Sequence, residues 1–143
     1  GRFGNAAGQA LSSTNDPAVL DWGTQVLLRG GFIERPFRVP LGVSAIVRLR
    51  AVSPSSTAAT TTNAAYNLDG LDPDLNDARD GRWVVEALIG GVPTEDAARL
   101  NLQLDGAVTT LASDVANQRD TSGRVKYDAS KSTTDVLIYL AHR

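Results

Sequence analysis

The chain has 143 residues, a formal net charge of −2 and a pI of about 5.3, with 42% hydrophobic and 21% charged residues. These values are ordinary for one globular domain with its own core. They lack the basic footprint of a nucleic-acid-binding domain, so we expect no nucleic-acid partner. The absence of cysteine excludes disulfides and thiolate metal sites. No methionine is present, so Gly1 is expected to be a processed or cut end behind a removed upstream segment.

The N-terminal third is predicted to hold a tail and then a helix. Residues 1–15 are small and polar and are expected to form a loose tail, leaving 16–143 as a single globular domain. Asp16 suits an N-cap and Pro17 suits the first helical position. The apolar spacing that follows predicts an amphipathic helix over 16–29, ended by a glycine pair.

A strand is the clearest element of the first half. Residues 43–52 alternate apolar and polar side chains with a period of two, which indicates a half-buried strand. Arg48 and Arg50 fall on the polar face, where we expect them to be solvated. The Ser/Thr/Ala-rich residues 53–63 are expected to form an exposed loop.

An acidic loop at residues 71–81 is the only candidate metal site. Its alternating carboxylate and amide side chains could offer Ca²⁺ several hard oxygen ligands. The helix–loop–helix calcium pattern fails at two strict positions, because Asp77 replaces its glycine and Trp83 its bidentate glutamate. Turn formation by these side chains is therefore the favoured interpretation. The candidate calcium ligands are Asp72, Asp74, Asn76 and Asp80.

A strand–loop–helix joint is predicted over residues 83–106. The apolar run at 83–89 leaves strand and helix both open, and we favour a strand that runs into a loop at the following glycine pair. Thr94 is the expected cap of a second, short helix that ends at Gly106. The apolar stripe of that helix is Ala97, Leu100 and Leu104.

Two strands are predicted at the C-terminus, over residues 124–127 and 135–141. Both faces of the second are apolar, which predicts a central position in a sheet. Residues 107–118 have no clear pattern. The element order predicts an α+β fold, with an N-terminal helix packed on a mainly antiparallel β-sheet, a second short helix and long loops.

The second half resembles the C-terminal part of type IV pilin-like proteins and pseudopilins. The resemblance rests on residues 96–100 leading to Leu104-Asp105-Gly106, on 123–127, and on the closing run 136–141. It implies a structural subunit that assembles with other pilin-like subunits into a type IV pilus-like or secretion-system pseudopilus filament. The head would lie on the extracellular or periplasmic face, with membrane contact only through the missing N-terminal apolar helix.

Two other classes of protein remain open. A self-assembling viral coat or shell protein would also combine small size, mixed α+β content and Thr/Ala-rich loops. A small hydrolase would need acid–base groups with separated pKa values. We expect no catalytic site and no resident cofactor, calcium aside. The acid–base candidates for a hydrolase would be Asp69, Asp72, Asp74, Glu86 and His142.

Overall fold

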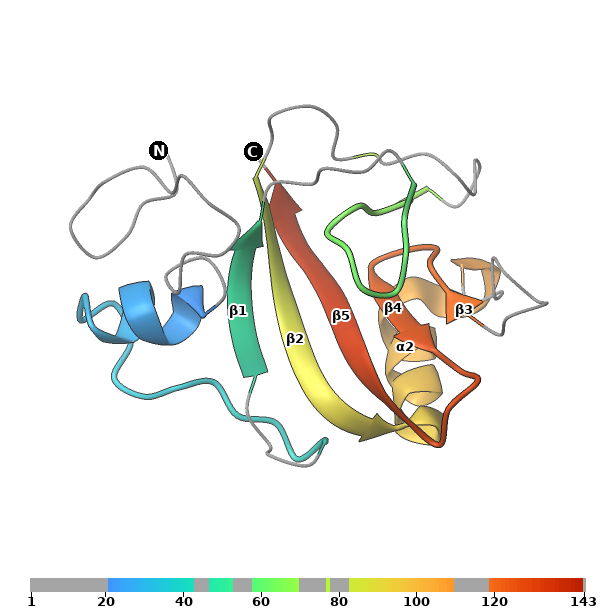
Figure 1. Ribbon diagram of the computed structural model, residues 1–143, viewed down its shortest axis with the longest axis horizontal. Coiled ribbons are helices and arrows are strands. Elements are labelled where there is room, and N and C mark those ends of the chain that lie inside the picture. Colours follow the sequence, from blue (N-terminus) through green and yellow to red (C-terminus); the bar gives the residue numbers. More distant parts are fainter. Residues whose placement is uncertain are drawn as a thin grey trace.

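A five-stranded antiparallel sheet forms the centre of the molecule (Figure 1). The computed structural model describes residues 21–42, 47–52, 58–69, 77, 83–109 and 119–142. In chain order the elements are η1 (Gly23–Leu28), β1 (Val47–Val52), β2 (Val84–Pro93), α2 (Thr94–Thr109), β3 (Arg119–Asp120), β4 (Val125–Asp128) and β5 (Thr133–His142). The strand order is β1-β2-β5-β4-β3. The predicted α+β class, the mainly antiparallel sheet and the central place of the last strand are confirmed.

Strand β2 continues through the glycine pair where a loop was predicted. The register with β5 shifts between Ile89 and Val92, so the two glycines form a bulge inside the strand. Gly91 adopts a φ of 67°, which glycine tolerates without steric cost. Its N–H donates to the Asp135 carboxylate at 3.1 Å, which replaces the ladder hydrogen bond that a bulge forgoes.

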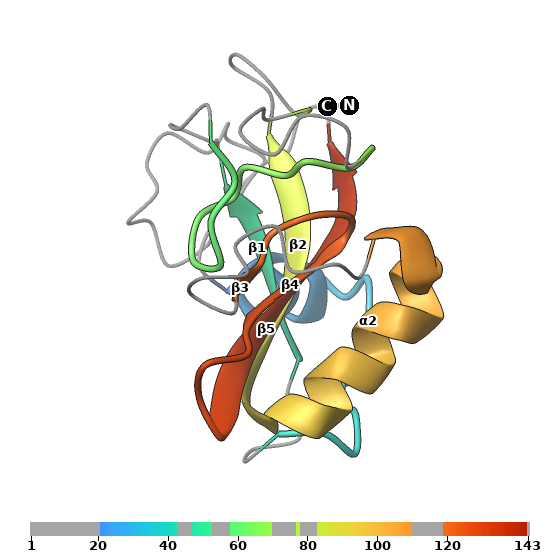
Figure 2. The same ribbon diagram turned by 90° about the vertical axis from the view of Figure 1, so that its right-hand side faces the viewer.

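The helix packed on the sheet is α2, so the prediction of an N-terminal helix in this position is wrong. Figure 2 shows α2 on one face of the sheet, and Ala97 at its contact side is fully buried. Of the helix predicted at 16–29, residues 16–20 lie outside the described residues. The part that follows forms only η1, beside the edge strand β1. Its buried residues are only Gly23 and Val26, too little apolar surface to cover a sheet face.

The apolar stripe of α2 is confirmed only in part. Ala97 is buried in the core cluster between α2 and the sheet, and Leu100 packs against that cluster, but Leu104 is 49% exposed. Thr94 does begin the helix, but its hydroxyl donates to the carbonyl of Lys131, tying α2 to the β4–β5 turn.

The C-terminal end of α2 is fastened to the start of β4 by Asp105. Its carboxylate accepts hydrogen bonds from the backbone N–H of Arg124 at 2.9 Å and of Val125 at 2.8 Å. Gly123 has a φ of 77°, and a Cβ there would lie 2.5 Å from the Asp105 carboxylate. The close approach of the Asp105 carboxylate therefore requires glycine at position 123.

Gly106, with φ 75° and ψ 177°, breaks the regular helix as predicted.

Replacing Asp105 by asparagine should destabilise the fold by about 2 kcal/mol, because one of two charge-assisted hydrogen bonds is lost and an amide NH₂ then faces a backbone N–H. Asp96→Asn is the matched control on the same helix. Asp96 only pairs with Arg99 across 3.5 Å at the surface, and such pairs contribute little. Urea unfolding of both variants measures the difference. Equal stability of the two would contradict the anchoring role of Asp105.

Candidate functional site

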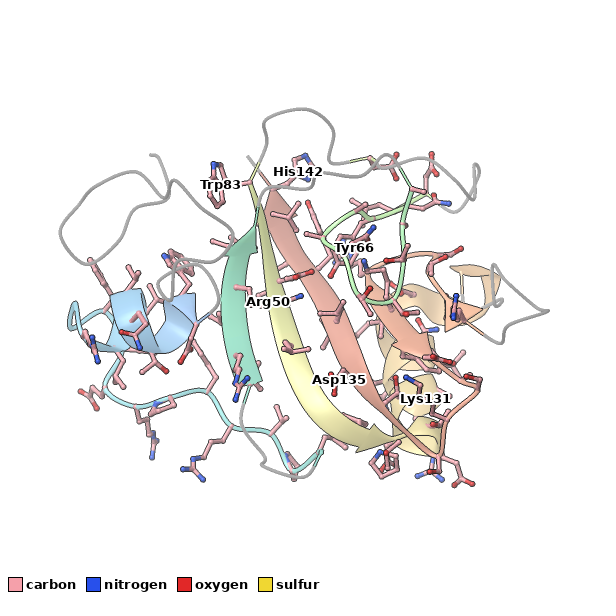
Figure 3. All side chains as sticks on the ribbon, viewed as in Figure 1. Arg50, Tyr66, Trp83, Lys131, Asp135 and His142 are labelled. Atoms are coloured by element: carbon pink, nitrogen blue, oxygen red, sulfur yellow. The ribbon has the colours of Figure 1, made fainter. Side chains whose placement is uncertain are left out.

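A buried carboxylate, Glu86 of β2, is the centre of a charged network on the sheet face opposite α2. Its side chain is 0% exposed. Arg50, directly opposite on β1, forms an ion pair with Glu86 Oε1. The hydroxyl of Tyr66 donates to Oε2 at 2.6 Å. Arg50 and Tyr66 are labelled in Figure 3, and they reach Glu86 from an edge strand and from a loop. The network thus joins three segments that are distant in the sequence.

Lys126 of β4 fastens the loop at residues 58–69 to the same face. Its Nζ donates to the backbone carbonyls of Asn63 at 2.6 Å and Ala65 at 2.7 Å. The ammonium also lies 3.9 Å from the centroid of the Tyr66 ring, within the range of a cation–π contact. Lys126 is fully buried. The prediction that residues 53–63 form an exposed loop is therefore wrong at Asn63, which binds the buried amine of Lys126. Residues 53–57 lie outside the described residues.

Successive side chains of β4 point to opposite faces of the sheet, so its apolar residues and its lysine lie on different faces. Val125 and Tyr127 belong to the core cluster that includes Ala97 of α2. Lys126 lies between them in sequence and projects to the other face, as strand geometry requires. There Tyr66 packs with Val84 in a second, smaller cluster. One face is therefore closed by a helix and the other by a loop held through polar contacts.

Burial shifts the pKa of the groups in this layer towards their uncharged forms. It lowers the pKa of Lys126 from 10.5 to about 7, although the charge of Glu86 opposes the shift. Burial, with the adjacent Glu86 carboxylate, raises the pKa of Tyr66 well above 10. On the α2 face of the sheet, burial likewise raises the pKa of Asp120 of β3 from 3.8 to about 7. Hydrogen bonds from Ser122 and from Asn101 of α2 partly offset this shift.

Two of the acid–base candidates from the sequence, Glu86 and His142, are held by different partners. Glu86 is bound by Arg50 and Tyr66, as described above. The Nδ1 of His142 contacts the Tyr139 hydroxyl, and the Tyr139 ring packs edge-on against Tyr66 at 5.4 Å. Asp69 is exposed at the end of the loop, and Asp72 and Asp74 lie outside the described residues. Glu86 and His142 are therefore bound by two different tyrosines, whose rings pack against each other.

The calcium prediction falls on residues that the structure does not describe. Asp72, Asp74, Asn76 and Asp80 all lie in the undescribed parts of the acidic loop. Asp77 is the described member, and its carboxylate accepts the backbone N–H of Leu68 and of Asp69, the latter at 3.3 Å. This contact is of the turn-forming kind. Over the described ranges no group of three or more potential metal ligands occurs, so the calcium site stays a prediction.

A polar cleft of about 500 Å³ lies between the 58–69 loop and the β4–β5 turn. Its carboxylates already have internal donors, because Asp135 accepts the Gly91 N–H and Asp128 accepts the Ser130 N–H at 3.0 Å. Lys131 lies 3.6 Å from Asp128, and both Lys131 and Asp135 are labelled in Figure 3. Asp128 and Lys131 therefore close the hairpin turn, and Asp135 closes the bulge of β2.

Comparison with protein-family models, curated proteins and solved structures gives no match for this chain. Across the described residues, the helices are too short or too polar to cross a lipid bilayer.

Sequence reasoning missed the roles of Arg50, Tyr66 and Lys126. Arg48 is exposed as predicted, but the Arg50 side chain is only 18% exposed and is bound to Glu86, so its predicted solvation is wrong. One signal was available: Glu86 interrupts an otherwise apolar strand, and a charge in that position needs a partner. Nothing in the sequence pattern shows that the partner comes from β1.

Replacing Arg50 by methionine should cost about 3 kcal/mol, because it keeps the apolar stem but leaves the Glu86 carboxylate buried without its cation. Arg48→Met, two residues away on the same face of β1, should change the free energy of unfolding by less than about 0.5 kcal/mol. Urea unfolding of the two variants provides the comparison. A similar loss of unfolding free energy in both variants would show that the Arg50–Glu86 ion pair contributes no more to stability than a solvated arginine.

The stability of the protein should depend on the ionisation of Asp120. The pKa of Asp120 is higher in the folded state, so its contribution is present below about pH 4 and is lost as the pH rises through about 7. Asp120→Asn should remove this downward slope. Lys126 acts on the alkaline side: its lowered pKa makes stability rise between pH 7 and 10.5.

Urea titrations at a series of pH values, on the wild type and Asp120→Asn, measure the two slopes. The difference in unfolding free energy between the two proteins isolates Asp120 from every other titrating group. A difference that stays constant from about pH 4 to 8 would contradict the raised pKa.

Proposed function

We propose that this chain is the head domain of a pilin-like structural subunit, from a type IV pilus-like or secretion-system pseudopilus filament. The three segments that carry the resemblance form one unit of structure. Residues 96–106 form most of α2, 123–127 lead into and begin β4, and 136–141 lie within β5. Strands β4 and β5 pair directly, and α2 contacts both. This contiguity supports the proposal, because unrelated local similarities would have no reason to meet.

The Asp105–Gly123 contact carries the proposal. It joins the Leu104-Asp105-Gly106 segment to the Gly123-Arg124-Val125 segment through two hydrogen bonds to one carboxylate. The two segments are separated by residues 107–122, so their pairing could not be read from spacing. An acceptor at 105 and a glycine at 123 are both required by the contact. Two of the three segments that carry the resemblance are therefore held together by one carboxylate.

The buried network also supports a structural role. Glu86, Arg50 and Lys126 direct their charges at one another or at backbone carbonyls. Such pairs fasten layers together, and their removal is costly because one charge is left uncompensated in the interior. In the proposed filament, the head presents its exposed surface to neighbouring subunits, and a separate apolar helix supplies the membrane anchor before assembly.

Cysteine labelling on whole cells of the source organism tests this proposal. The chain has no cysteine, so Ala98→Cys places a single thiol on the exposed face of α2. A membrane-impermeant maleimide should label this variant without lysis, and the label should appear in filaments sheared from the cells. Ala97→Cys is the matched control, because Ala97 is fully buried and should react only after unfolding.

Two results would overturn the proposal. One is labelling of Ala98→Cys only after lysis, or its absence from the sheared fraction. The other is the formation of closed particles by purified residues 1–143, which would favour a coat protein, whereas an isolated head should remain monomeric in light scattering.

The coding sequence upstream of Gly1 should encode about 20 apolar residues behind a short basic leader.

A further inference from the structure

The Asn63 side chain lies within reach of the buried Lys126 amine. Lys126 Nζ is 3.5 Å from Asn63 Oδ1 and 2.6 Å from the backbone oxygen of the same residue. A second carbonyl, that of Ala65, holds the amine at 2.7 Å. These contacts fix the amine beside the side-chain amide. Holding two groups in such proximity replaces the entropy loss of a bimolecular encounter.

The carbonyl of the Asn63 amide is polarised by two backbone donors. Its Oδ1 accepts the N–H of Thr60 at 3.0 Å and the N–H of Ala65 at 3.2 Å. Paired backbone N–H groups at a carbonyl oxygen stabilise negative charge that develops there during nucleophilic attack. The amide nitrogen Nδ2 donates to the carbonyl of Ala58 at 2.8 Å, which keeps the oxygen and nitrogen of the amide in this orientation.

The amine has the properties of a nucleophile. Lys126 is fully buried between β4 and the loop, so burial lowers its pKa to about 7 and a large fraction is uncharged at neutral pH. In the ammonium form, Nζ donates to the backbone carbonyls of Asn63 and Ala65 and to Asn63 Oδ1. In the uncharged form, two N–H groups satisfy the two backbone carbonyls, and the lone pair replaces the donor that faced the Asn63 amide. Asn63 itself is half-buried, which gives a small leaving group a route to solvent.

We propose that Lys126 and Asn63 form an intramolecular amide cross-link. The Nζ lone pair attacks the side-chain carbonyl carbon of Asn63 and forms the new C–N bond, while the negative charge develops on Oδ1. A proton then moves from Nζ to Nδ2, the bond from the carbonyl carbon to Nδ2 breaks, and ammonia leaves. The product is a secondary amide, no oxidant or cofactor is consumed, and one N–H remains for a backbone carbonyl.

The cross-link would fasten the 58–69 loop covalently to the sheet. It closes a loop of more than 60 residues between positions 63 and 126, and constraints on long loops remove the most entropy from the unfolded chain. The proposal is independent of the filament role. A monomer that never assembles would still carry the bond, so the two proposals fail separately.

Intact mass and peptide mapping of the purified chain test the bond. After incubation at about pH 9, where the buried amine is uncharged, the mass should be lower than the sequence mass by one ammonia. Trypsin should release a branched peptide in which residues 51–79 are joined to 125–131 through Asn63 and Lys126. The full sequence mass after incubation, or separate linear peptides only, would overturn the proposal.

Two variants distinguish the cross-link from succinimide formation, which loses the same mass. Lys126 and Lys131 are the two lysines of the chain. Lys131→Arg should still lose ammonia, whereas Lys126→Arg should keep the full mass. Loss of ammonia in Lys126→Arg would identify a succinimide and contradict the cross-link. The branched peptide of the unaltered chain decides the question even if Lys126→Arg does not fold.

Discussion

The burial of the Glu86 carboxylate is the constraint on which the layered structure depends. A carboxylate removed from water without partners costs several kcal/mol, which is a large part of the stability of a small domain. Glu86 meets this cost through Arg50 of β1 and Tyr66 of the loop. Strand and loop must therefore both be in place before the centre of the sheet is stable. The Glu86 carboxylate therefore determines where β1 and the 58–69 loop are placed, as well as how stable the sheet is.

The two faces of the sheet are closed by different physical means. On one face, the small side chain of Ala97 lets α2 approach an apolar core, and Asp105 fixes the end of the helix. On the other face, a loop with few large apolar side chains cannot adhere by hydrophobic burial alone. Lys126 supplies the missing attachment by donating to two loop carbonyls. A loop in this position needs such donors, because its buried backbone carbonyls would otherwise be unsatisfied.

The sequence predicts those features that follow from local periodicity. The alternation in β1, the central place of β5 and the break at Gly106 were all readable, and the structure confirms them. The prediction that β5 is buried on both faces is wrong at Leu140, which is 49% exposed. The Glu86–Arg50 pair was not readable, because the register that places the two opposite each other is set by the packing of the whole sheet. The bulge at Gly91 was missed for a similar reason: it depends on the Asp135 carboxylate, which lies far away in the sequence.

The Asp105–Gly123 contact shows how two short segments that lie far apart in the sequence are held together. A carboxylate that caps a distant turn requires an acceptor at one position and a glycine at the other, with little demand on the residues between. Both oxygens of the Asp105 carboxylate are engaged by backbone donors, so the side chain acts as a cap on this turn.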